Sequence, residues 1–125
     1  MNIGIVGCGN ISETYFESQK IFNNFKIIAC ADINKEAAST AASKYNVKAL
    51  SVDEIVENNE IDLIINLTIP AAHKEIITKS IFNGKHCFSE KPLAMNFAEG
   101  IEIEKIANDN NLYVGCAPDL SLIHI

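Results

Sequence analysis

Two glycines, Gly7 and Gly9, stand one residue apart directly after a short apolar run, in the stretch GCGNIS. Between a strand and a helix, the first glycine of such a pair allows a tight bend, and the second lets a pyrophosphate approach the backbone. The backbone N–H groups of Asn10, Ile11 and Ser12 would then face that phosphate at the start of a helix. Ser12 replaces the third glycine of the usual pattern. Taken alone, the stretch fits a purely structural turn as well as it fits a phosphate site.

An acidic residue at the end of the next apolar run favours the phosphate site. Asp32 closes the stretch KIIACAD, 20 residues after Ser12. The acid that binds the adenosine ribose in dinucleotide-binding folds follows at a spacing of ~20 residues. The alternative is an ordinary Asp in a turn or a helix cap. A carboxylate here would repel the 2′-phosphate of NADP, and Lys35 is the nearest cation. We therefore expect NAD rather than NADP.

Short β-rich runs alternate with helical patterns along the whole chain. The expected strands are Asn2–Val6, Lys26–Ala31, Val47–Leu50, Leu63–Leu67, His86–Phe88 and Leu112–Gly115. The expected helices are Ile11–Phe22, Lys35–Tyr45, Val52–Asn58, Ala71–Phe82 and Phe97–Asn110. This alternation predicts an α/β fold, a doubly wound parallel sheet (Rossmann fold) of about six strands in a single domain. A flavodoxin-like sheet is the alternative, and it would leave Asp32 without a role.

Local signals mark the ends of several helices. Asn34, Ser51 and Asn96 are the expected N-caps, and Ser51 is followed by a glutamate at the capping-box position. In the first helix, the expected apolar stripe consists of Ile11, Tyr15 and Phe22.

Composition excludes several classes of protein. The chain has 125 residues, 48% of them hydrophobic, and a formal net charge of -6. Such a surface repels nucleic acid, so we expect no nucleic-acid partner. No apolar window approaches a membrane span, and no basic segment precedes the first apolar run, so we expect a cytoplasmic protein without a membrane partner. The four cysteines show no clustered spacing, which predicts reduced, buried thiols and no metal site.

Three later stretches are distinctive: DLIINLTIPAAH, GKHCFSEKPLA and GCAPD. Together with GIVGCGNIS and ACADIN, they resemble the dinucleotide-binding half of the Gfo/Idh/MocA oxidoreductases, the family of glucose–fructose oxidoreductase and inositol dehydrogenase. The resemblance runs from Asn2 to about Asp119, and its most specific part is the tripeptide Glu90-Lys91-Pro92. Methyltransferases that use S-adenosylmethionine share the glycine turn and the acid, but they have no counterpart to this tripeptide.

The resemblance implies further cofactor contacts. Leu67, Thr68 and Pro70 follow a buried strand and would line the dinucleotide, although a strand exit with a helix-starting proline explains much of the same pattern. The resemblance also implies that His73 contacts the cofactor or substrate near the nicotinamide. The alternative for His73 is a surface or half-buried histidine without a function.

The same resemblance assigns the chemistry to one dipeptide. It implies that Glu90 and Lys91 both contact the cofactor beside the nicotinamide ribose. It also implies that Lys91 is the catalytic residue, which orients the substrate and assists proton movement during hydride transfer. The alternative is a solvated surface pair. We expect a cis bond between Lys91 and Pro92, which would turn Lys91 into the cofactor cleft.

The chain is shorter than members of the family it resembles. We expect residues 2–119 to form the NAD(P)-binding domain, residues 120–125 to be a short divergent tail, and the substrate domain to be absent. The expected function is that of an NAD-dependent oxidoreductase acting on a sugar, polyol or cyclitol, inactive as this chain alone. The alternative is a non-catalytic NAD(P)-binding regulatory or interaction module. We also expect a homo-oligomer, because apolar surface would be left uncovered.

Overall fold

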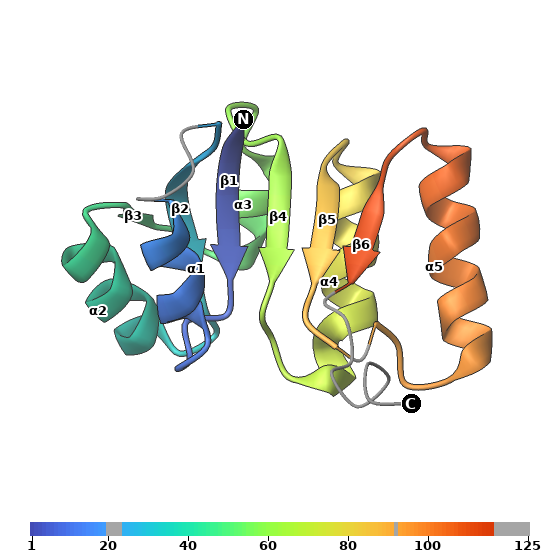
Figure 1. The fold of residues 1–125 in the computed structure, drawn as a ribbon, viewed down its shortest axis with the longest axis horizontal. Coiled ribbons are helices and arrows are strands. Elements are labelled where there is room, and N and C mark those ends of the chain that lie inside the picture. The colour runs from blue at the N-terminus through green and yellow to red at the C-terminus, as the bar shows by residue number, and fades with distance from the viewer. Residues whose placement is uncertain (20–23, 92, 117–125) are drawn as a thin grey trace.

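The computed structural model describes residues 1–19, 24–91 and 93–116, and its core is one six-stranded sheet (Figure 1). The strands are β1 Asn2–Val6, β2 Lys26–Ala31, β3 Lys48–Ala49, β4 Leu63–Asn66, β5 His86–Ser89 and β6 Val114–Cys116. They lie in the order β3-β2-β1-β4-β5-β6, and every pairing is parallel. The strand order reverses at β1, as in the predicted Rossmann fold. The fold prediction is therefore confirmed.

Helices cover both faces of this sheet. They are α1 Ser12–Ser18, α2 Lys35–Tyr45, α3 Val52–Glu57, α4 His73–Phe82 and α5 Phe97–Asp109. On one face, Phe16 of α1 and Ala41 of α2 pack against Ile5 of β1 in one apolar cluster. On the other face, a second cluster joins residues of α3, α4 and α5, including Ile77 and Ile103. Because β1 and β4 are covered on both sides, their sequences are almost continuously apolar.

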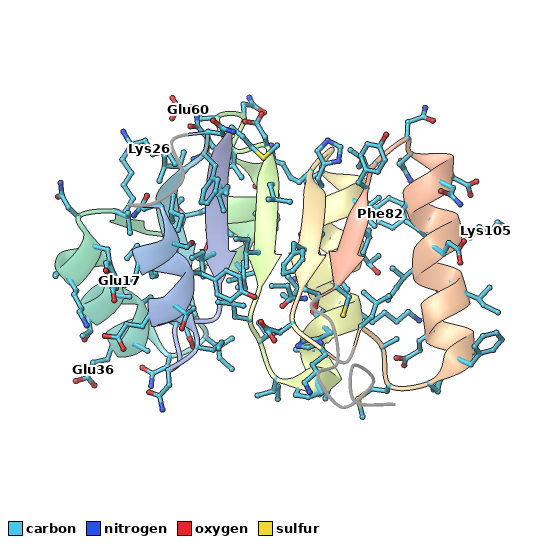
Figure 2. All side chains as sticks on the ribbon, in the orientation of Figure 1. Glu17, Lys26, Glu36, Glu60, Phe82 and Lys105 are labelled. Atoms are coloured by element: carbon cyan, nitrogen blue, oxygen red, sulfur yellow. The ribbon has the colours of Figure 1, made fainter. Side chains whose placement is uncertain are left out.

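The strand register determines where the candidate site lies. One row of paired residues crosses the sheet and closes five strands: Ala31, Val6, Asn66, Ser89 and Cys116. The residues that directly follow this row therefore lie side by side at the carboxyl ends of the strands, which we call the carboxyl edge of the sheet. They are Asp32, Gly7, Leu67 and Glu90. At the opposite edge, where the strands begin, Figure 2 shows the charged side chains of Lys26 and Glu60. Ligands of open parallel sheets bind at the carboxyl edge.

The predicted helix caps are confirmed. The Asn34 side chain accepts hydrogen bonds from two backbone N–H groups of α2, and Asn96 accepts one from the Glu99 N–H of α5. Ser51 and Glu54 form a complete capping box at the start of α3. These contacts satisfy N–H groups that a helix start otherwise leaves without partners.

The first helix differs from the prediction. It is buried through Phe16, which is fully covered and stacks on the Tyr45 ring at a centroid distance of 4.2 Å. Ile11 of the predicted stripe is 46% exposed, because it lies in the turn before the helix. Phe22 lies outside the described residues, as do Pro92, with its predicted cis bond, and the predicted tail 120–125. The helix predicted from Ala71 instead starts as a 3-10 turn, Pro70–Ala72, before α4.

Candidate functional site at the carboxyl edge

The two glycines of the turn after β1 are required for different reasons. Gly7 has a φ of +105°, and a Cβ built on it would lie 2.6 Å from the backbone carbonyl of Leu67. Only glycine fits there, because side chains disfavour this φ and the neighbouring backbone leaves no room. Gly9 does not have a positive φ, and a Cβ on it would meet nothing within 4 Å. Neither the backbone conformation nor the packing of the protein therefore requires glycine at position 9. A pyrophosphate that lies against this backbone would require it, because a side chain would occupy the same space.

Ser12 stabilises the turn from inside. Its hydroxyl donates to the Gly9 carbonyl at 2.6 Å, its backbone N–H donates to the same oxygen at 3.1 Å, and the side chain is buried. Asn10 and Ile11 lie between these two residues and are exposed. The serine in place of a third glycine thus closes the turn by hydrogen bonding, while the exposed backbone faces outward.

The Asp32 carboxylate is tied directly to the glycine turn. Its Oδ2 accepts a hydrogen bond from the Cys8 N–H at 2.7 Å, and its Oδ1 accepts one from the Asn34 N–H at 2.8 Å. A carboxylate oxygen has two lone-pair sites, so both oxygens can still accept from ribose hydroxyls. A hydrogen bond with the Cys30 thiol, burial and the nearby Asp32 charge raise the pKa of Cys8. The sequence spacing of acid and turn therefore corresponds to a direct contact.

A cleft of about 480 Å³ opens beside these groups. Gly7, Gly9 and Asp32 lie along it, together with Leu67 and Thr68 from the exit of β4. The rest of the lining consists of the apolar residues Val6, Ile33, Val52, Ile69, Ala72 and Ile76 and the charged residues Glu75 and Lys79. Ile33 is 94% exposed and Ile69 is 69% exposed. Apolar walls with a few polar groups are typical of cofactor clefts.

The exit of β4 is held by a buried polar network. The Asn66 side chain is fully buried; it donates to the His73 carbonyl at 3.1 Å and accepts from the Thr68 hydroxyl at 2.6 Å. His73 is 1% exposed, and its Nε2 donates to the Thr68 carbonyl at 2.7 Å. His73 is not among the residues that line the cleft. The predicted contact residue thus lies behind the loop and holds Thr68, and Pro70 begins the 3-10 turn beside it.

Glu90 has a partner that the sequence prediction missed. The Tyr15 hydroxyl donates a hydrogen bond to Glu90 Oε1, and the Tyr15 ring lies 6.4 Å from that of Phe88. Burial, the hydrogen bond to Glu90 and the Glu90 charge raise the pKa of Tyr15. The Glu90 N–H also donates to the Asn66 carbonyl at 3.0 Å. The sequence pattern places Tyr15 on the apolar stripe of the first helix and gives no sign that its hydroxyl meets a carboxylate 75 positions away.

Lys91 follows Glu90 and is exposed at the same edge of the sheet. The edge therefore combines a glycine turn, two carboxylates, a lysine and an apolar cleft.

Two other features are absent from the part of the chain that the structure describes. Within these residues, no three His, Cys, Asp or Glu side chains gather as metal ligands. None of the helices described here is long and apolar enough to cross a membrane.

Comparison with known proteins agrees with this geometry. Residues 1–117 match the family model of the Gfo/Idh/MocA oxidoreductases, described as an oxidoreductase family with an NAD-binding Rossmann fold. An inositol 2-dehydrogenase from Agrobacterium fabrum is 31% identical over an alignment of 106 residues, which covers 80% of this chain and 31% of the relative. A myo-inositol 2-dehydrogenase from Thermotoga maritima is 27% identical over an alignment of 101 residues, which covers 79% of this chain and 30% of the relative. The chain thus spans about a third of the length of these relatives.

Solved structures show the same fold. A dehydrogenase from Clostridium difficile superposes with a TM-score of 0.86 at 23% identity, over 94% of this chain and 39% of that one. Biliverdin reductase from Synechocystis, solved with biliverdin and NADP+, also gives a TM-score of 0.86 at 23% identity, over 92% of this chain and 37% of that one. The chain belongs to the Gfo/Idh/MocA oxidoreductase family, and its described residues have the Rossmann fold that the description of that family names as NAD-binding.

Proposed function

We propose that this chain is the cofactor-binding part of an NAD-dependent oxidoreductase that acts on a secondary alcohol of a sugar, polyol or cyclitol. The observation that carries the proposal is the contact between the Asp32 carboxylate and the Cys8 N–H, because it joins a ribose-binding acid to a phosphate-binding turn beside an apolar cleft. The substrate class is inferred from the inositol dehydrogenases among the relatives.

The residues at the carboxyl edge suit the parts of the dinucleotide. Gly7 and Gly9, with the backbone N–H groups of Asn10 and Ile11, would hold the pyrophosphate. The Ser12 N–H, also predicted to face the phosphate, instead donates to the Gly9 carbonyl and would support the turn. Asp32 would accept from the hydroxyls of the adenosine ribose.

The cleft suits the adenine. Ile33 and Ile69 line the cleft and expose their apolar side chains, which a planar base would cover. Leu67 and Thr68 would line the dinucleotide at the exit of β4, with Pro70 and the buried His73 supporting this loop.

The preference for NAD over NADP also follows from Asp32. Its carboxylate lies where the adenosine ribose would be bound, and a 2′-phosphate on that ribose would meet a negative charge. Calorimetric titration of the purified chain with NAD and with NADP tests this preference. Tighter binding of NADP would contradict it, and binding of neither would contradict the cofactor site itself.

On the other side of the turn, Glu90 and Lys91 would serve the nicotinamide half and the substrate. Bound NAD supplies the nicotinamide carbon that accepts or returns a hydride. The Lys91 ammonium, exposed at the edge of the sheet, would donate a hydrogen bond to the reacting hydroxyl and assist its proton transfer. In an active protein that contains this domain, Lys91→Ala should lower kcat much more strongly than it lowers the NAD affinity.

We also propose a homo-oligomer, and the cytoplasm as its compartment. Phe97 and Ile101, one turn apart on α5, are 83% and 50% exposed, and contiguous apolar surface of this kind favours association. Light scattering on the wild type and on Phe97→Ser tests the oligomer: a monomeric wild type would contradict it. Cell fractionation followed by immunodetection tests the compartment.

A further inference from the structure

One hydrogen bond connects the glycine turn to the far side of the sheet edge. Tyr15 lies in α1, which begins at Ser12, immediately after the turn. Its hydroxyl donates to Glu90 Oε1 across 75 positions of sequence. Glu90 is anchored at its backbone as well, through its N–H to the Asn66 carbonyl at 3.0 Å. Both ends of the contact are therefore held by ordered elements.

The strand order shows which half of a bound dinucleotide would lie near Glu90. Asp32 follows β2 and Glu90 follows β5, so the two carboxylates lie on opposite sides of the glycine turn after β1. A dinucleotide consists of two nucleotide halves joined at a pyrophosphate. If the pyrophosphate lies on Gly9 and the adenosine half lies toward Asp32, the nicotinamide half must extend over β4 toward Glu90.

We infer that Tyr15 is a positioning residue for the nicotinamide half of the cofactor, holding the Glu90 carboxylate at a defined distance from the glycine turn. This inference rests on the proposed NAD site. Two features of Tyr15 suit this role. Its side chain is half-buried, and its ring packs beside the Phe88 ring at an interplanar angle of 56°. Packing fixes the ring, and the hydroxyl fixes the carboxylate.

The surroundings of this pair keep the Tyr15 hydroxyl protonated, so that it can donate its hydrogen bond to Glu90. The raised pKa of Tyr15 keeps its phenol protonated at neutral pH. Burial and the Glu90 charge also raise the pKa of the Cys116 thiol at the end of β6, so Cys116 adds no negative charge at neutral pH. Glu90 thus remains the acceptor, and its second oxygen is available for a ribose hydroxyl.

The test separates the two halves of the ligand. NAD and ADP share the adenosine and both phosphates, but ADP lacks the nicotinamide and the ribose that carries it. Calorimetric titration of the 125-residue chain with both ligands should show that Tyr15→Phe weakens NAD binding about five-fold, a fraction of what a hydrogen bond to a charged group contributes, and leaves ADP affinity within about two-fold. Tyr113→Phe is the matched control, because Tyr113 is 82% exposed on the approach to β6. It should change neither affinity.

A double-mutant cycle shows whether Tyr15 acts through Glu90. In the Glu90→Ala background, Tyr15→Phe should have no further effect on NAD affinity. Glu90→Gln provides a second variant that keeps the tyrosine intact, and it should lose less NAD affinity than Glu90→Ala because its amide oxygen still accepts from Tyr15. Equal losses for NAD and ADP, or a Tyr15→Phe effect that persists without Glu90, would overturn the inference. A wild type that binds neither ligand would instead overturn the proposed cofactor site.

Discussion

Asp32 and Cys8 are joined by a 2.7 Å hydrogen bond from a backbone N–H to a carboxylate, which connects the end of β2 to the turn after β1. The same carboxylate accepts from the Asn34 N–H. Asp32 therefore has a structural role in the turn in addition to its proposed role toward ribose, and an experiment on it must separate the two.

Asp32→Asn is the better test of ribose binding, because the amide oxygen still accepts one backbone hydrogen bond. We expect NAD affinity to fall about tenfold, since hydrogen bonds to charged groups contribute about 1.5–3 kcal/mol, and we expect a smaller loss of stability than in Asp32→Ala because only one N–H group loses its acceptor. Asp32→Ala should in addition destabilise the fold by about 1–3 kcal/mol, because it leaves two N–H groups without their acceptor. Calorimetry and urea unfolding measure these effects. Unchanged NAD binding in Asp32→Asn would refute the ribose assignment.

The two glycines should respond oppositely to substitution. Gly9→Val should keep the wild-type Tm and weaken NAD at least about tenfold, because the side chain enters the space proposed for the pyrophosphate. Gly7→Ala should lower the free energy of unfolding by at least about 2 kcal/mol, since the φ of +105° and the Leu67 backbone both oppose a Cβ. Thermal unfolding and NAD titration of both variants distinguish a structural glycine from a ligand-binding one. Normal NAD binding by Gly9→Val would place the pyrophosphate elsewhere.

The capping box of α3 should contribute a pH-dependent part of the stability. Hydrogen bonds from the Ser51 backbone and side chain hold the pKa of Glu54 below its ordinary value of 4.5. A depressed folded-state pKa stabilises the protein above pH 4.5, and this contribution is lost as the pH falls through the lower value. The stability difference between wild type and Glu54→Gln, from urea unfolding, should therefore shrink on acidification. Glu57→Gln, at the exposed end of α3, is the control and should show no such trend.

Burial raises the pKa of the Cys87 thiol to about 12, although a hydrogen bond with Ser80 partly offsets this. In the unfolded chain the thiol ionises near 9.0, so the folded state loses stability as the pH rises above that value. Cys87→Val should remove this alkaline slope, which urea unfolding at several pH values measures.

At pH near 8, alkylation of native Cys87 followed by mass spectrometry should be much slower than in urea. Rapid native alkylation would show that the thiol is accessible.

The purified chain should bind NAD without turning over substrate. Lys91 is exposed, and hydride transfer needs the alcohol carbon held against the nicotinamide, a positioning effect that contributes about 7–11 kcal/mol in well-oriented reactions. Incubation with NAD and a panel of polyols, followed by absorbance of the reduced cofactor, measures this. A full-length inositol dehydrogenase in the same mixture is the positive control. Turnover that disappears in Lys91→Ala would contradict the expectation.

The sequence alone determined the fold class, because its signals act between residues that are close in the chain. Capping by Asn34 and Ser51 involves neighbours two or three positions away. The continuous apolar runs of β1 and β4 indicated strands covered on both faces. The spacing of Asp32 after the glycine turn was equally readable, because one βαβ unit has a nearly constant length.

Only the tertiary structure decided which side chains meet at the carboxyl edge. The contact between Tyr15 and Glu90 joins residues 75 positions apart, and it depends on the register that places Val6, Asn66 and Ser89 in one row. The burial of His73 depends likewise on the packing of α4 behind the β4 exit. Local sequence carries no information on such contacts, because they arise from the packing of whole elements against one another.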